Sequence, residues 1–216
     1  MVFLDVLNIA KGAGITMMFS LLGIMIGVPL GLALALIRWG KIPLLSQLTA
    51  CYVSIIRSAP LVTFILFVFY APALIDVEIS PIVASILALS LNIAAFNSEI
   101  WRTALMSTPK SQIETAQAMG MTKRLVFFKV IYPQVWRRSI SGLVNDMTIL
   151  IKLTPAVAVI GVVEITRMAS RVGASTYDPL PPFLVATLIY VVILLFLVRG
   201  QRVLERKIAS KYGLKA

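Results

Sequence analysis

Four polar side chains interrupt apolar stretches of this sequence, and their chemistry is the first indication of a binding function. Asn145, Asp146 and Lys152 fall in one apolar segment, and Arg57 falls in an earlier one. A charge near the centre of a bilayer costs on the order of 3 kcal/mol, so it needs a compensating neighbour, a wet cavity or a ligand. A zwitterionic ligand presents both opposite charges. We therefore expect these four residues to line a substrate path.

Two simpler interpretations of the same residues remain open. Lys152 or Asp146 could pair with a group on its own or a neighbouring helix and never meet a substrate. Arg57 lies in the first turns of its segment and could extend its guanidinium to the membrane surface. A further pair, Glu99 and Arg102, stands three residues apart, which places both side chains on one face of a helix, where they could form an ion pair.

The composition indicates an integral membrane protein. The 216 residues are 59% hydrophobic and 13% charged, whereas soluble domains have about one quarter charged residues. The chain has no histidine, the commonest metal ligand and general base, and its single Cys51 excludes an intrachain disulfide. We therefore expect no metal site, no catalytic residues and no enzymatic activity on this chain.

The apolar segments predict a single all-α domain over residues 1–216 with five membrane spans. In the first span Gly23, Gly27, Gly31 and Ala35 recur every four residues, a pattern that lets another helix approach closely. We interpret this stripe as a packing surface. The predicted spans are residues 15–37, 51–71, 81–100, 139–165 and 183–198.

The basic residues predict the orientation of these spans. Five spans place the two ends of the chain on opposite sides, and Arg38, Lys41, the polar insert 109–133 and the tail 200–216 all fall on one side. Since lysine and arginine concentrate in cytoplasmic loops, we expect the N-terminus outside and the C-terminus in the cytoplasm. The net charge of +11 is explained in this way, so nucleic acid is not an expected partner.

The insert 109–133 predicts two short helices joined at a glycine. Ser111 and Glu114 form a capping-box pattern, which predicts a helix from Gln112. Gly120 falls where a left-handed residue would end that helix. Thr122 can cap a second helix, which Pro133 should stop or kink. Taken alone, this segment could be an ordinary solvated loop.

The insert resembles the EAA loop of ABC importer permeases, whose pattern is E-A-A, three residues, G, nine residues and I-x-L-P. The spacing is kept throughout. The usual alanine, isoleucine and leucine are replaced at three of these positions. The matching positions are Glu114, Thr115, Ala116, Gly120, Val130, Ile131, Tyr132 and Pro133.

The flanking segments resemble the polar amino-acid permeases (the histidine, glutamate, arginine and glutamine type) over nearly the whole chain. The sequence departs from that family at Thr103, Ala104, Leu153 and Pro155, among other positions. The matching segments are Gly12 with Thr16, Arg57-Ser58-Ala59-Pro60-Leu61, Glu99-Ile100-x-Arg102, Lys152-x-Thr154 and Ile160-Gly161-Val162-Val163-Glu164.

This resemblance implies a type I ABC importer fold and a role as one membrane subunit of an amino-acid importer. The expected partners are an ABC ATPase dimer, a second permease subunit of the same or a related kind, an extracytoplasmic binding protein and the lipid of the bacterial inner membrane. Glu114, Ala116, Gly120 and Pro133 would couple this chain to the ATPase. ATP and Mg would bind that partner, because the sequence contains no G-x-x-x-x-G-K-[ST] phosphate loop.

Two other functions remain compatible with these residues. A self-sufficient secondary transporter or channel for small zwitterions could use the same polar groups without an ATPase. A membrane scaffold could use the insert to recruit a cytosolic protein.

Overall fold

The protein is a bundle of helices in the computed structural model, which describes residues 3–212. All regular elements in this range are helical, which confirms the predicted all-α class. The elements are α1 (Phe3–Trp39), α2 (Leu45–Ser58), α3 (Leu61–Tyr70), η1 (Ala71–Ile75), α4 (Pro81–Met106), α5 (Lys110–Ala118), α6 (Lys123–Val126), η2 (Phe127–Ile131), α7 (Tyr132–Leu153), η3 (Thr154–Ile160), α8 (Ile165–Thr176) and α9 (Leu180–Tyr212).

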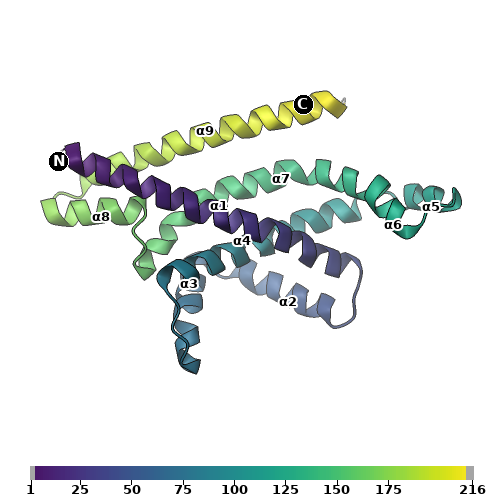
Figure 1. Cartoon of the computed structure of the whole chain (residues 1–216), viewed down its shortest axis with the longest axis horizontal. Helices are drawn as coiled ribbons and strands as arrows, with labels where there is room; N and C mark the ends of the chain where they lie inside the picture. Colours follow the sequence, from purple (N-terminus) through teal and green to yellow (C-terminus); the bar gives the residue numbers. More distant parts are fainter. Residues whose placement is uncertain (1–2, 213–216) are drawn as a thin grey trace.

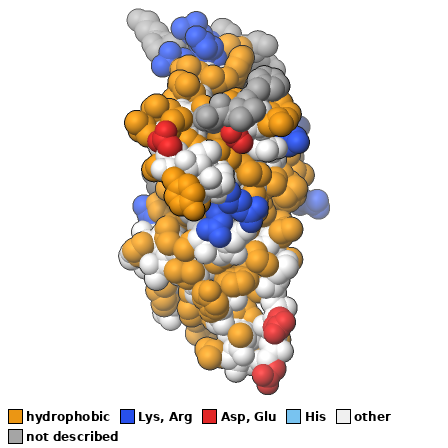
Figure 2. All heavy atoms as spheres, turned by 90° about the vertical axis from the view of Figure 1, so that its left-hand side faces the viewer, with side chains coloured by type: hydrophobic (Ala, Val, Ile, Leu, Met, Phe, Trp, Pro, Cys, Tyr) orange, Lys and Arg blue, Asp and Glu red, His pale blue; other side chains and the backbone are white. Residues whose placement is uncertain are grey.

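The long helices lie roughly along one axis of the molecule (Figure 1). The helices α5 and α6 lie at one end of this axis, where α9 also ends, while the N-terminus and α8 lie at the opposite end. The segment formed by α3 and η1 turns away from the bundle. Figure 2 looks at the α8 end and shows hydrophobic side chains over much of this face, with basic side chains at its top and near its middle, and acidic ones above the middle and at its lower tip.

Within residues 3–212, four helical segments are long and apolar enough to cross a membrane, and the bent pair of α2 and α3 would make a fifth. The two helices of that pair meet at 116°. Pro60 explains the break, since Ala59 before it is extended (φ −80°, ψ 134°), as a residue preceding proline prefers. The second predicted span, 51–71, is therefore two helices and not one.

The helices α1, α4 and α9 extend beyond the spans predicted at 15–37, 81–100 and 183–198. The fourth predicted span, 139–165, differs from the structure at its C-terminal end. The continuous helical stretch begins at Lys123 and ends at Ile160, where Gly161 adopts a left-handed conformation (φ 93°). Residues 161–164 therefore lie outside the helix that the span 139–165 predicted. Residues 173–182 are rich in turn-forming residues, yet they contain the end of α8, because that helix continues to Thr176.

The stripe of small residues on α1 packs against α4, as predicted. A Cβ atom on Gly27 would lie 1.8 Å from Ile93 Cγ2 and 2.7 Å from the Ser90 carbonyl oxygen. A Cβ on Gly31 would lie 3.0 Å from the carbonyl oxygen of Ala94. The two backbones can approach this closely only because these α1 positions carry no side chain.

A buried carboxylate joins three helices at the α8 end. Glu164 is fully buried and accepts hydrogen bonds from the backbone N–H groups of Thr166 (2.9 Å) and Arg167 (2.7 Å), which caps α8. The Tyr190 hydroxyl of α9 donates to the same carboxylate at 2.7 Å. Gly12 of α1 lies against this cap, since a Cβ there would be 2.7 Å from the backbone nitrogen of residue 165.

The contact between α1 and α4 makes a prediction about stability. Gly27→Ala forces atoms together within the membrane-spanning core, so we expect the variant to lose roughly 1–3 kcal/mol of stability. The measurement is the thermal unfolding midpoint of the purified protein in detergent. Gly14→Ala is the matched control, because a Cβ at Gly14 meets nothing within 4 Å. Equal midpoints for the two variants would contradict the packing described here.

Candidate functional site

The first candidate site is the segment that matches the EAA pattern. Its first helix, α5, begins at Lys110, with Pro109 at the cap position and no side-chain cap. The predicted capping box and the start at Gln112 are therefore wrong. The fixed φ of Pro109 (−61°) already sets the start of the helix, which places Ser111 inside the first turn, where it cannot cap.

Gly120 and Thr122 shape the turn between α5 and α6 as predicted. Gly120 is left-handed (φ 81°), and the N–H groups of Gly120 and Met121 close the helix on the carbonyls of Gln117 (2.9 Å) and Ala116 (3.1 Å). This is the Schellman arrangement that favours glycine. The Thr122 hydroxyl accepts the hydrogen bond that begins α6, from the Leu125 N–H at 3.4 Å.

An open hollow of about 390 Å³ lies beside α5. Ala116 is buried at its base, while Glu114 is exposed on α5 and does not line it. The Gln134 side chain donates to Gln112 Oε1 at 2.8 Å, which ties α5 to the start of α7. The lining residues are Ser111, Gln112, Thr115, Ala116, Met119, Met121 and Val130.

A turn of π-helix separates α6 from α7 and accounts for Pro133. The Tyr132 N–H bonds to the Phe127 carbonyl, one residue further back than in an α-helix. Proline has no N–H for the carbonyl four residues earlier, and its ring would clash with that carbonyl in an α-helix. The wider π turn therefore accommodates Pro133, which lies in the first turn of α7 and does not stop the helix.

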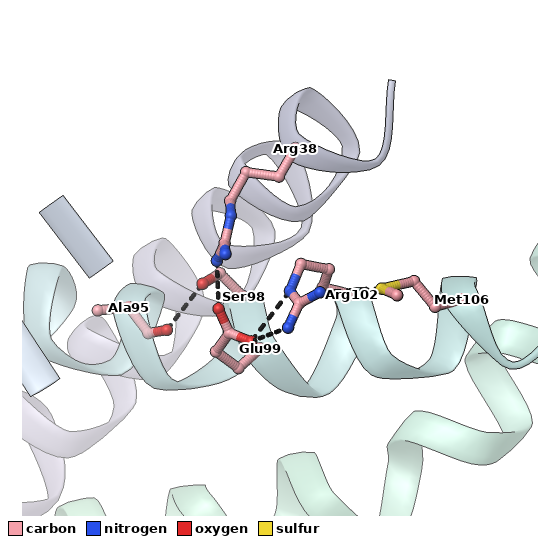
Figure 3. Close-up of polar contacts among 6 residues, drawn as sticks. All are labelled: Arg38, Ala95, Ser98, Glu99, Arg102 and Met106. Carbon is pink, nitrogen blue, oxygen red and sulfur yellow. Dashed lines mark hydrogen bonds and ion pairs between the residues drawn. The ribbon is translucent and has the colours of Figure 1, made fainter. Parts of the chain in front are cut away.

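A cluster of three charged residues joins α1 to α4 towards the α5 end of the bundle (Figure 3). Glu99 accepts hydrogen bonds from Arg102 Nε (3.0 Å) and NH2 (2.7 Å), which confirms the predicted pairing. The Arg38 guanidinium donates to the other oxygen of the same carboxylate. Arg38 was not predicted as a partner, because it lies 61 residues away in the sequence.

The second candidate site surrounds Asp146. This side chain lines a pocket of about 70 Å³ between α4 and α7, and its Oδ2 atom is buried without a hydrogen-bond partner. The Arg57 guanidinium lies 5.3 Å from the centre of the Phe96 ring and interacts electrostatically with Asp146. The other lining residues are Asn92, Ile93, Phe96, Ile149, Leu150 and Leu153.

The structure brings two of the four predicted path residues together and leaves the other two nearby. Asn145 and Lys152 are exposed on α7, seven residues apart and so on one face, and they do not line the Asp146 pocket. Asn92 and Phe96 do line it, and sequence analysis did not single out Phe96. The sequence signal that could have identified Phe96 is its spacing of four residues from Asn92, which places both on one helix face.

Comparison with known proteins places this geometry in a family. Residues 27–210 match the model of the "binding-protein-dependent transport system inner membrane component". The chain belongs to this family. A permease of the L-cystine transport system of Bacillus subtilis is 35% identical over 201 residues, covering 93% of this chain and 86% of the relative. A permease of the arginine transport system of the same organism is 33% identical, covering 94% and 93%.

Solved structures show that this inner membrane component has the fold expected of an ABC importer permease. A crystal structure of an amino-acid ABC transporter with histidines superposes with a TM-score of 0.88 at 27% identity, covering 96% of this chain and 99% of the other. An inward-facing methionine ABC transporter superposes with a TM-score of 0.70 at 20% identity, covering 94% of each chain, and supports the fold alone. The predicted fold and family are therefore confirmed.

The charged cluster makes the second prediction. Glu99→Gln leaves the Arg38 and Arg102 guanidiniums without a counter-charge in a partly buried position, so we expect a loss of about 1–3 kcal/mol, between the values for exposed and buried ion pairs. The measurement is the thermal midpoint in detergent. Glu78→Gln, at an exposed position, is the control and should leave the midpoint unchanged. An unchanged midpoint for Glu99→Gln would show that the cluster contributes nothing to stability.

Proposed function

We propose that this permease is one membrane-spanning subunit of an ATP-driven importer for polar amino acids. It forms half of the translocation path and is coupled to a separate ATPase. The observation that carries the proposal is the position of the EAA-type segment: α5 and α6 lie at one end of the bundle, tied to the helix α7 that carries Asp146. A movement imposed on α5 would therefore reach the polar pocket through one element.

The four proposed coupling residues have different roles in this segment. Gly120 gives the tight turn that lets α5 project as a separate short helix, and Ala116 keeps the base of the hollow small. Glu114 is exposed and available to a basic group of the ATPase. Pro133 holds the π turn through which α6 passes into α7. The ATPase dimer binds ATP and Mg, and this chain binds neither.

The proposed orientation rests on the same arrangement. The α5 end is the cytoplasmic end, which places the C-terminus in the cytoplasm and the N-terminus and α8 outside the bacterial inner membrane. Support comes from the basic residues at the α5 end, including Lys110, Lys123 and Arg124. An extracytoplasmic binding protein would then deliver substrate to the α8 end.

The substrate path runs past Arg57, Asn145, Asp146 and Lys152. The Asp146 pocket of about 70 Å³ is well below the roughly 300–1,000 Å³ of a typical small-ligand site. A second permease subunit, identical or related, would complete it from the facing side. Arg57 can then hold the carboxylate of an amino acid, and Asp146 its ammonium group. Relatives of this chain are permeases of cystine and arginine transport systems, which supports amino acids as the substrate class.

A self-sufficient secondary transporter is the competing function, since the Asp146 pocket by itself would serve either mechanism. The two differ in their need for an ATPase. If the purified chain alone in liposomes moved amino acids down an ion gradient, the importer proposal would be abandoned.

Coupling through α5 makes the third prediction. Gly120→Asp places a side chain at a left-handed position, and Glu114→Lys reverses an exposed charge on α5. We expect each variant to abolish the ATP hydrolysis that substrate-loaded binding protein stimulates in the reconstituted complex, while membrane insertion is unchanged.

The control for coupling is Gly200→Asp, at an exposed position where a Cβ meets nothing within 4 Å. It should leave stimulation intact. Unchanged stimulation in both Gly120→Asp and Glu114→Lys would count decisively against the proposed coupling role.

The substrate path makes the fourth prediction. Asp146→Asn removes the charge that would meet the ammonium group, and Lys152→Met removes a charge from the exposed face of α7. We expect each to lower transport at limiting substrate at least tenfold, which is about 1.4 kcal/mol. The measurement is uptake of labelled amino acid by the reconstituted complex. Retained affinity and rate in both variants would remove these residues from the path, and Asp178→Asn serves as the control.

A further inference from the structure

A second open hollow, of about 370 Å³, lies between α4 and α7 on the α5 side of the Asp146 pocket. No sequence pattern predicted it. Its wall contains one acid, one base and two hydroxyls, so its chemistry is polar although both helices are membrane-spanning. The lining residues are Glu99, Ile100, Thr103, Ala104, Ser107 and Arg138.

The hollow continues the α4 and α7 faces that form the Asp146 pocket. On α4, Asn92 and Phe96 line the pocket, and Thr103 and Ser107 line the hollow, at spacings that keep one helix face. From Phe96 to Ser107 is about 16 Å at 1.5 Å per residue. On α7, Arg138 lies two turns before Asp146 on the same side.

A narrow contact separates the two spaces. Gly142 lies on α7 midway between Arg138 and Asp146, and a Cβ there would be 3.0 Å from Ile100 Cγ2. Ile100 therefore packs against the bare backbone of α7. A solute that moves from the Asp146 pocket towards the α5 end along this groove must pass that contact and then enters the hollow.

The charges around the hollow favour a carboxylate. Glu99 is already shared by Arg38 and Arg102, so this cluster carries one excess positive charge (Figure 3). Arg138 NH1 donates to the Ser107 carbonyl oxygen (2.7 Å) and to its hydroxyl (2.8 Å). Within residues 3–212 no ion pair neutralises Arg138. Its remaining N–H groups have the fork geometry that binds a carboxylate.

We propose that this hollow is an inner station for the transported amino acid, where Arg138, oriented by the Ser107 hydroxyl, holds its carboxylate after it has passed Ile100 and Gly142. The inference rests on the proposed import function. It adds a second binding site, on the release side, to the site at Asp146. Amino acid already inside the cell can enter the same station, so it competes with release and slows import.

The test uses the complete importer in liposomes, with ATPase inside and loaded binding protein outside. The probe is whichever of labelled arginine, glutamine, histidine or cystine the wild-type complex imports fastest. Initial uptake is measured with increasing unlabelled probe inside, and inhibition is expressed relative to the uninhibited rate of each variant. A general loss of activity therefore does not count as a change in the inner station.

We expect interior probe to inhibit the wild type. Arg138→Gln should raise the half-inhibitory interior concentration at least tenfold, and Ser107→Ala should raise it by a smaller factor. Arg137→Gln, the neighbouring arginine that does not line the hollow, is the matched control and should leave it unchanged. Arg138→Lys keeps the charge without the fork and should fall between the wild type and Arg138→Gln.

Four outcomes would overturn the inner station. Interior probe could fail to inhibit the wild type, or Arg138→Gln could leave the half-inhibitory concentration unchanged. Equal inhibition by interior acetate or inorganic phosphate, or inhibition that depends only on the content of anionic lipid, would show a general anion site or a headgroup site instead. Each of these leaves ATP-dependent uptake by the wild type intact, whereas failure of the proposed import function would appear as its absence.

Discussion

The close contact between α1 and α4 is the constraint on which the other arrangements depend. Between membrane helices there is no hydrophobic driving force beyond that of lipid, so close packing of small residues must hold them together. The bare backbone at Gly27 and Gly31 allows that approach. It also fixes the end of α1 beside α4, so that Arg38 reaches Glu99. The wall of the inner hollow is therefore determined partly by glycines that lie several turns away.

A second feature is the mechanical continuity from α5 into α7. Gln112 and Gln134 join the two helices directly, and the Phe127 ring contacts both Tyr132 and Trp39, with centroids 6.2 Å apart in each case. The π turn thus lies within an aromatic contact that includes the end of α1. These contacts join α5, the π turn, α7 and the end of α1, as the proposed coupling to an ATPase requires.

Much of this arrangement could be predicted from local patterns, and the rest depended on contacts between distant residues. Apolar segment length indicates membrane helices, and Gly120 and Thr122 are local signals whose geometry the structure confirms. The ion pair of Arg38 with Glu99 could not be predicted, since no spacing rule connects different helices. The cap at Ser111 was predicted wrongly because the rigid φ of Pro109 sets the helix start more strongly than a side-chain hydrogen bond does.

The break at Pro60 leaves backbone groups that need hydrogen-bond partners. A helix that ends leaves its last carbonyl groups without partners in the helix, and the next helix begins with unbonded N–H groups. Hydrocarbon offers them nothing, so non-helical backbone at bilayer depth is tolerated only beside protein or water. The 116° bend between α2 and α3 therefore needs protein or water beside it, and Arg57 lies there, three residues before the proline. The same neighbours would also accept hydrogen bonds from its guanidinium.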